Sequence, residues 1–198
     1  MDRYAELEKA VKNYRAERIK AKEEYLHNHY SRLFPLLFTT LDILIQEQVT
    51  LQEENKQENI KNVSFHRLLS SGYTQSYEIA VGLSNENLYL DDHMSYAYWK
   101  PEWVYENIDC DMEEIRKCLS VKFVRLEDAE LLHIKQKILL DDWKLFCGIL
   151  EKMAAEIAEK LISSPLLLDT ELQILYGNYM DRLSVAGQFR TERVGSNG

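Results

Sequence analysis

The sequence contains little glycine and little proline. Seven glycines and three prolines in 198 residues lie well below the ordinary usage of roughly 7% and 5%. This scarcity excludes collagen-like, linker-like and proline-rich disordered chains, and it disfavours a β-sandwich or barrel, which needs turn residues about every 8–12 positions. Hydrophobic residues make up 45% of the chain, so general disorder is excluded as well. A mainly helical globular protein remains.

Long apolar segments and an even set of cysteines are also absent. The longest unbroken apolar run covers residues 33–38, far short of the roughly 20 residues that span a bilayer. The first residues carry no apolar stretch of the kind found in secretory signals. The cysteines Cys110, Cys118 and Cys147 are odd in number and irregularly spaced, which does not fit a disulfide framework. We therefore expect a cytoplasmic protein with no membrane partner.

Acidic residues exceed basic ones. The chain has 33 Asp and Glu against 24 Lys and Arg, a net charge of −9. Such a chain repels phosphate backbones, so a nucleic-acid partner is disfavoured. The basic residues that crowd positions 9–22 alternate with glutamates, a pattern typical of a solvated helix with salt bridges between successive turns.

Helical periodicity covers most of the chain. Apolar residues recur every three or four positions over residues 2–30, 35–54, 111–126 and 127–162. The signal is strongest in the last of these, a near-heptad stripe with Phe146 and Leu150 at its centre. Two weaker helices are predicted over residues 65–71 and 169–183, while residues 121–126 could alternatively form a strand.

The segment around residues 76–100 has a different character. Residues 76–83 and 88–99 are rich in Tyr, Ile and Val and are interrupted by turn residues, which predicts short antiparallel strands. The fold class we predict is mainly α: a bundle of about four or five helices with a small inserted antiparallel β meander. Residues 1–186 would form one domain, and residues 187–198 a flexible tail.

Metal sites are poorly supported. Glu24 with His27 and Glu130 with His133 form two Glu-x-x-His pairs, which in ferritin-like bundles join two further glutamates, here Glu47 and Glu171, around two metal ions. Such pairs arise by chance in a glutamate-rich chain, and the periodicity places Glu130 opposite the apolar stripe of its helix. His27 and His29 diverge by about 200° on a helix and cannot share an ion unless the helix has ended there. We expect no metal and no cofactor.

Catalytic motifs are not evident either. The doublet Asp91-Asp92 lies in a predicted turn, and Asp141-Asp142 is predicted on the exposed side of a helix. No nucleophile elbow, phosphate-binding loop or dinucleotide fingerprint accompanies them. No catalytic residue is predicted, and enzymatic activity is disfavoured without being excluded.

Aromatic residues concentrate between positions 73 and 105. Tyr and Trp dominate protein interfaces because they bury a large area and keep a polar tip. Strand alternation places Tyr96 and Tyr98 on one face and Trp99 on the other. The alternative is that the rings only cover the small sheet as part of the core. The candidate binding residues are Tyr96, Tyr98, Trp99, Trp103 and Tyr105.

These features favour a non-enzymatic cytoplasmic protein–protein interaction module. An acidic inhibitor, immunity-type or accessory protein that acts on a basic partner would suit the charge. A homodimer is predicted through the narrow apolar edge of the first helix, formed by Tyr4, Leu7, Val11 and Tyr14. The alternative function is a small-molecule-binding or metal-dependent helical-bundle enzyme.

Overall fold

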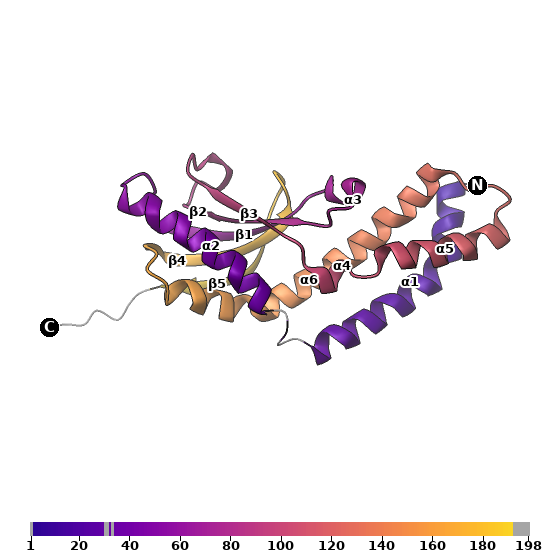
Figure 1. Ribbon diagram of the computed structural model, residues 1–198, viewed down its shortest axis with the longest axis horizontal. Helices are drawn as coiled ribbons and strands as arrows, with labels where there is room; N and C mark the ends of the chain where they lie inside the picture. Colours follow the sequence, from indigo (N-terminus) through magenta and orange to yellow (C-terminus); the bar gives the residue numbers. More distant parts are fainter. Residues whose placement is uncertain (1, 30–31, 33, 192–198) are drawn as a thin grey trace. The chain divides into compact units, whose positions relative to one another are not determined.

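The structure is a computed structural model that describes residues 2–29, 32 and 34–191 (Figure 1). The chain divides into two compact units. The helical unit consists of residues 1–32 and 101–146, and the sheet unit consists of residues 33–100 and 147–198. The prediction of a single domain over residues 1–186 stays a prediction.

The helical unit contains α1 (Arg3–Asn28), α4 (Glu102–Tyr105), α5 (Ile108–Lys122) and the part of α6 (Asp128–Ile162) up to Phe146. Asp2 starts α1, since its side chain accepts a hydrogen bond from the backbone N–H of Tyr4 at 3.0 Å. The apolar stripes of α1, α5 and α6 are buried as the periodicity predicts. The buried residues include Leu7, Val11, Ile115, Leu119, Ile134 and Ile138.

The sheet unit contains α2 (Phe34–Glu53), β1 (Ile60–Arg67), α3 (Ser71–Thr74), β2 (Ile79–Ser84), the 3-10 turn η2 (Leu88–Leu90), β3 (Ser95–Trp99), the rest of α6, β4 (Leu168–Asn178) and β5 (Ser184–Arg190). The strand order is β3-β2-β1-β4-β5. β1 runs parallel to β4, and the other neighbours are antiparallel.

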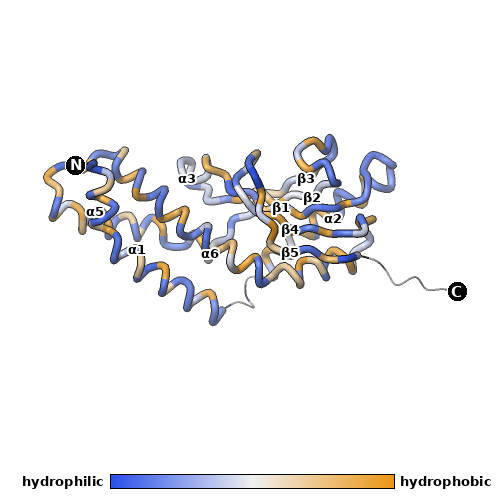
Figure 2. The backbone as a smooth tube through the Cα atoms, turned by 180° about the vertical axis from the view of Figure 1, so that it is seen from behind, coloured by the Kyte–Doolittle hydropathy of each residue, from blue (hydrophilic) through white to orange (hydrophobic). Residues whose placement is uncertain are grey.

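Helices cover one face of this sheet. Gln48 of α2 donates to Ser95 of β3 at 2.7 Å, and the Tyr176 hydroxyl of β4 donates to Glu151 of α6 at 2.9 Å. β5 approaches α6 so closely that a Cβ atom at Gly187 would lie 2.9 Å from the Cβ of Ala154. By strand alternation, the opposite face carries Ser64, His66 and Gly82 and their neighbours. That face lies in front of α2 in Figure 2.

The predicted helical bundle with a small meander is wrong. The structure has a five-stranded mixed sheet, and two segments predicted as helices are strands. Most of the predicted helix over residues 65–71 belongs to the end of β1 and the loop after it. Ser64, which precedes this segment and would suit a helix cap, is a buried strand residue instead. The predicted helix over residues 169–183 is β4 and a turn. Of the expected tail, residues 187–190 belong to β5 and residues 192–198 lie outside the described residues.

Other predicted elements are confirmed. The helices α1, α2, α5 and α6 fall within one to four residues of the predicted segments, and residues 121–122 end α5 and form no strand. Phe146 and Leu150 are both 0% exposed. Across residues 2–29, 32 and 34–191, no helix combines the length and apolar character needed to cross a membrane.

Candidate functional site: a tyrosine pocket on the sheet

A pocket of about 430 Å³ opens on the sheet face that α2 does not cover. We call it the tyrosine pocket. Its volume falls in the range of small ligand sites, roughly 300–1,000 Å³. The lining is rich in hydroxyl groups and consists of Leu68, Ser70, Ser71, Thr74, Ser76, Glu78, Ala80, Tyr96, Tyr98 and Tyr179.

The register of β2 and β3 places two of the rings. Tyr96 pairs with Gly82 and Tyr98 pairs with Ala80. Alternate residues of a strand share a face, so both rings stand on the same side of the sheet above small neighbours. A Cβ atom at Gly82 would lie 2.8 Å from Cε1 of Tyr96, closer than two carbon atoms pack. Glycine at this position therefore makes room for the Tyr96 ring.

The third ring comes from the end of β4. The centroid of Tyr179 lies 6.0 Å from that of Tyr96, with the ring planes at 65°. It also lies 6.0 Å from Tyr89, with the planes at 77°. These are edge-to-face arrangements of the kind that aromatic pairs favour. Tyr179 and Tyr96 thus meet as two walls of a corner, with Tyr89 behind them.

A directed chain of hydrogen bonds lies behind the rings. The Met180 N–H donates to the Tyr89 hydroxyl oxygen at 3.2 Å, and that hydroxyl contacts Nδ1 of His66 at 3.1 Å. Nε2 of His66 contacts the Ser64 hydroxyl at 2.8 Å, and Ser64 donates to the carbonyl of Gly82 at 3.4 Å. The donors and acceptors agree only if the His66 proton sits on Nε2.

Burial keeps this histidine neutral. His66 and Ser64 are both 0% exposed, and burial lowers the pKa of the His66 imidazole to about 4. A tyrosine–histidine–serine line resembles the geometry that activates a serine nucleophile. Here, however, Ser64 is enclosed, and neither Ser64 nor His66 lines the pocket. These hydrogen bonds therefore support the ring cluster, and Ser64 is not accessible as a nucleophile from the pocket.

The charge of the pocket is negative. Among the described residues, its lining contains one carboxylate, Glu78, and no basic side chain. A second carboxylate, Asp181, follows Met180. Hydrogen bonds from the Arg182 N–H and from the Asn178 amide lower the pKa of Asp181, so it is ionised at neutral pH.

Backbone strain gathers around the same site. Gln75, Tyr77, Leu88 and Met180 have φ angles of +60°, +53°, +50° and +60°. Each is a neighbour of a pocket residue or of Tyr89. A side chain in this left-handed region costs on the order of 1–3 kcal/mol, and such residues cluster at binding and catalytic sites. These left-handed residues form tight turns beside the pocket.

The structure brings only two of the five predicted binding residues into this pocket. Tyr96 and Tyr98 line it, and Tyr98 is 66% exposed. Trp99 is buried on the opposite face of β3, as the alternation predicts. Trp103 and Tyr105 belong to α4 in the helical unit, where the Trp103 ring lies 6.4 Å from Phe146 and Tyr105 is buried.

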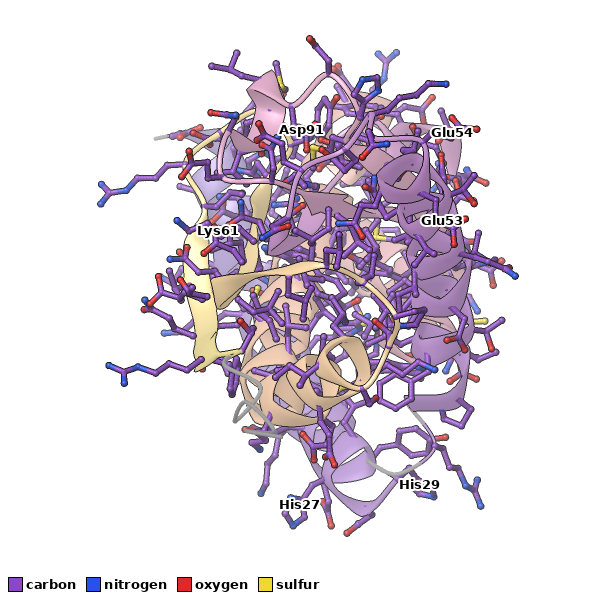
Figure 3. The ribbon with its side chains drawn as sticks, turned by 90° about the vertical axis from the view of Figure 1, so that its left-hand side faces the viewer. His27, His29, Glu53, Glu54, Lys61 and Asp91 are labelled. Atoms are coloured by element: carbon purple, nitrogen blue, oxygen red, sulfur yellow. The ribbon has the colours of Figure 1, made fainter. Side chains whose placement is uncertain are left out.

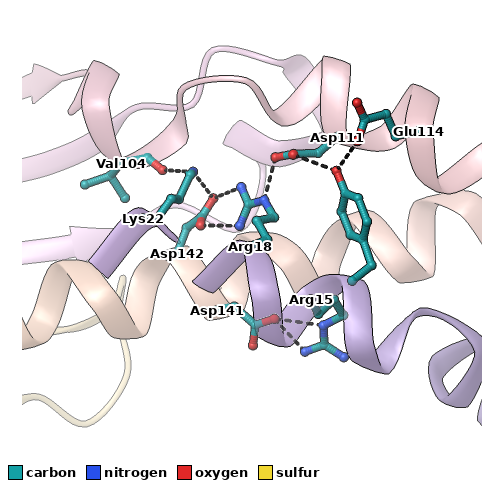
Figure 4. A network of polar contacts seen from close by, with 9 residues as sticks. Arg15, Arg18, Lys22, Val104, Asp111, Glu114, Asp141 and Asp142 are labelled. Atoms are coloured by element: carbon teal, nitrogen blue, oxygen red, sulfur yellow. Dashed lines mark hydrogen bonds and ion pairs between the residues drawn. The ribbon is translucent and has the colours of Figure 1, made fainter. Parts of the chain in front are cut away.

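The helical unit contains a buried charge network (Figure 4). Arg18 of α1 donates to both carboxylate oxygens of Asp142 at 2.6 and 2.8 Å and to Asp111 at 2.5 Å. Lys22 donates to Asp142 at 3.2 Å and to the carbonyl of Val104 at 2.6 Å. Burial disfavours the charge on Arg18, but the bonds and charges of Asp142 and Asp111 outweigh it and raise its pKa.

The ion pairs of α1 correct the sequence interpretation of three acidic residues. Asp141 and Asp142 were expected on the exposed side of their helix but are 8% and 0% exposed, and Glu130, expected opposite the apolar stripe, is 5% exposed and bonded to Arg3. The cations of α1 thus pair with carboxylates of α5 and α6. Because the charged groups drawn in Figure 4 all have partners, we interpret the network as the device that fixes α1 against its neighbours.

The metal-site candidates do not come together. His133 contacts Glu8 at 2.7 Å, and Glu171 lies on β4, outside any helix. Figure 3 shows the side chains of His27 and His29 pointing apart at the end of α1, and Nδ1 of His29 contacts the carbonyl of Tyr25 at 2.8 Å. Within the described residues, no group of three or more His, Cys, Asp or Glu side chains could hold a metal ion.

Asp91 plays the turn role that its position predicts. Its carboxylate accepts hydrogen bonds from the backbone N–H groups of Asn85 at 2.8 Å and His93 at 2.9 Å, and from the Gln57 amide at 2.9 Å. It lies in the loop beside β3 (Figure 3). These hydrogen bonds hold the loop in its conformation.

Comparison with known proteins adds no further constraint. No protein-family model matches the chain, and neither the curated proteins nor the solved structures contain a significant match.

Proposed function

We propose that this chain is a non-enzymatic protein-binding module that recognises a basic partner through the tyrosine pocket. An inhibitor, immunity-type or accessory role fits this description. The proposal includes a cytoplasmic location, which the number and spacing of the cysteines favour. It drops Trp99, Trp103 and Tyr105 from the recognition surface and adds Tyr179.

The exposure of Tyr98 is the observation that carries the proposal. A tyrosine that is 66% exposed contributes little to the core. Tyr73, one residue from the lining residue Thr74, is 61% exposed, and Tyr179 is 47% exposed. Large aromatic rings gathered in the open beside a pocket are the usual composition of an interface centre. The net charge of −9 favours a partner of opposite sign.

Binding of a small molecule is the second candidate, and the volume of the pocket, about 430 Å³, favours it. The alternative of a metal-dependent enzyme was predicted on a helical bundle, and the fold contains a five-stranded sheet instead; our proposal does not include it.

Selection from a displayed library of random peptides tests the protein-binding proposal. We expect wild-type protein to enrich peptides that contain Lys and Arg. Tyr98→Ala should weaken binding of a selected peptide about tenfold or more, the loss of about 1.4 kcal/mol that is common at interface hot spots. Far-ultraviolet circular dichroism of this variant should match that of the wild type.

Leu90→Ala is the matched control, since Leu90 of η2 is 84% exposed in the same unit and does not line the pocket. It should leave the affinity unchanged. Enrichment of acidic or neutral peptides, or equal losses in the two variants, would contradict the proposal.

A further inference from the structure

We propose that the tyrosine pocket binds an organic cation, the guanidinium or ammonium group of a basic side chain that the partner inserts. This inference rests on the proposed function and specifies which group of the partner is recognised. Ring geometry, charge and the direction of the hydroxyl groups support it separately.

The rings supply a cation-binding surface. A cation within about 6 Å of a ring centroid is attracted by the negative face of the ring. Tyr96 and Tyr98 stand two residues apart on β3, roughly 7 Å along the strand. Tyr179 meets Tyr96 at 65°. Two rings that meet at this angle in one pocket can contact a planar guanidinium or a compact ammonium from more than one side, and Tyr98 adds a third ring to the lining.

The charges around the rings agree with a cation and oppose an anion. Glu78 lines the pocket, while the described part of the lining has no Lys, Arg or His. In a pocket partly shielded from water, one carboxylate attracts an opposite charge more strongly than it would in open water.

Two hydroxyl groups of the lining are oriented as acceptors. Ser71 donates its hydrogen to the carbonyl of Leu68 at 2.8 Å. Thr74 lies within donating distance of the carbonyls of Ser70 at 3.3 Å and Ser71 at 3.4 Å and of the Ser76 hydroxyl at 3.4 Å. A hydroxyl whose hydrogen is already donated keeps only lone pairs for a ligand. Guanidinium and ammonium groups carry donors and no acceptor, so they match these two oxygens.

Nuclear magnetic resonance titrations with small probes test the inference. The probes are n-propylguanidinium, n-butylammonium, the neutral n-butanol and methyl glucoside. We expect saturable shifts of the Tyr96, Tyr98 and Tyr179 ring signals with the two cations. Tyr98→Phe should keep most of the affinity because the ring face remains, and Tyr98→Leu should lose about fivefold or more.

Glu78→Gln and Glu156→Gln form the matched pair for charge. Both remove one negative charge from the sheet unit, but Glu156 is an exposed residue of α6 that does not line the pocket. Glu78→Gln should weaken cation binding by about fivefold, and Glu156→Gln should not change it. Equal effects in the two variants would show general charge attraction and overturn the inference.

The outcomes also separate this inference from the proposed function. If selected peptides bind and depend on Tyr98, but the cations do not shift the ring signals, the inference is wrong and the proposed function stands. If the small cations bind but no peptide is enriched from the library, the pocket binds cations as inferred and the protein-binding proposal is overturned. Stronger binding of methyl glucoside or n-butanol than of the cations would overturn the inference in favour of a small-molecule site.

Discussion

The guanidinium of Arg18 is held on both sides by carboxylates, Asp142 on α6 and Asp111 on α5. Removing one member of a buried ion pair leaves the other charge without compensation, at a cost of roughly 3–5 kcal/mol. We expect Arg18→Met to lower the free energy of unfolding toward the lower end of this range, because Lys22 still contacts Asp142 at 3.2 Å. Urea denaturation measures the change.

The matched control for this variant is Arg116→Met. Arg116 pairs with Asp128 at 3.5 Å in the same unit, but the two side chains are 62% and 99% exposed, and such pairs contribute about 1 kcal/mol or less. Adding Asp142→Leu to Arg18→Met should restore part of the lost stability. If Arg18→Met and Arg116→Met proved equally mild, the buried network would not stabilise α1.

His66 makes stability depend on pH. Its pKa in the folded protein is about 4, against about 6.5 for an ordinary histidine. As pH falls, the unfolded chain therefore binds this proton first. The stabilising contribution is complete above about pH 6.5, is lost between pH 6.5 and 4, and stays lost below that.

His66→Gln isolates this effect from the titration of the carboxylates. Between pH 7 and 4, the wild type should lose on the order of 3 kcal/mol more stability than the variant. Urea midpoints across this range measure both curves. Parallel curves would mean that His66 takes up its proton at the same pH in the folded and the unfolded protein, which would contradict the lowered pKa.

At the scale of elements, α6 is the best test of what periodicity predicts. Leu150 lies in the sheet unit and is 0% exposed. Truncating a buried leucine removes its apolar contacts and leaves a cavity, so Leu150→Ala should cost roughly 2–5 kcal/mol. Lys152→Ala, an exposed change on the same helix, should shift the denaturation midpoint little. An unchanged midpoint for Leu150→Ala would contradict the burial of the stripe.

The sequence predicted the long helices because each buries one stripe and leaves the rest in water. It failed at β1, where polar and apolar residues alternate over only eight residues and Ser64 also suits the start of a helix. The polar positions of this strand are not exposed. Asn62, Ser64 and His66 are buried there as completely as Val63 and Phe65. Local residue patterns cannot show that β1 pairs with β4, which lies about 100 residues further along the chain.

The same long-range pairing explains what sequence reasoning found and missed in the tyrosine pocket. The density of aromatic residues identified Tyr96 and Tyr98, which lie on alternate pairs of one hairpin. Tyr179 was assigned to a helix, because Leu172, Leu175 and Tyr179 also satisfy helical spacing. Gly177-Asn178, which suits a helix interior poorly, was the available sign that a strand ends there.

At the scale of the whole molecule, the predicted dimer remains open to measurement. Leu7 and Val11 of the proposed edge are buried within the chain, whereas Tyr4 and Tyr25 of α1 are 43% and 44% exposed. A dimer through α1 would depend on these two rings. Light scattering should then give about twice 23.4 kDa for the wild type and one chain for Tyr4→Ser/Tyr25→Ser. A wild-type mass of one chain would contradict it.

The parallel pairing of β1 with β4 has a consequence for synthesis of the chain. β1 ends at Arg67 and β4 begins at Leu168. Protein synthesis adds about 5–20 residues per second, so the edge of β1 that pairs with β4 stays unpaired for roughly 5–20 s. An apolar strand edge left open for that time attracts other strands. Asn62, Ser64 and His66 make alternate positions of β1 polar, and this composition disfavours aggregation of a nascent strand. Ser64 and His66, which support the tyrosine pocket in the folded protein, are thus also expected to reduce aggregation of β1 during synthesis.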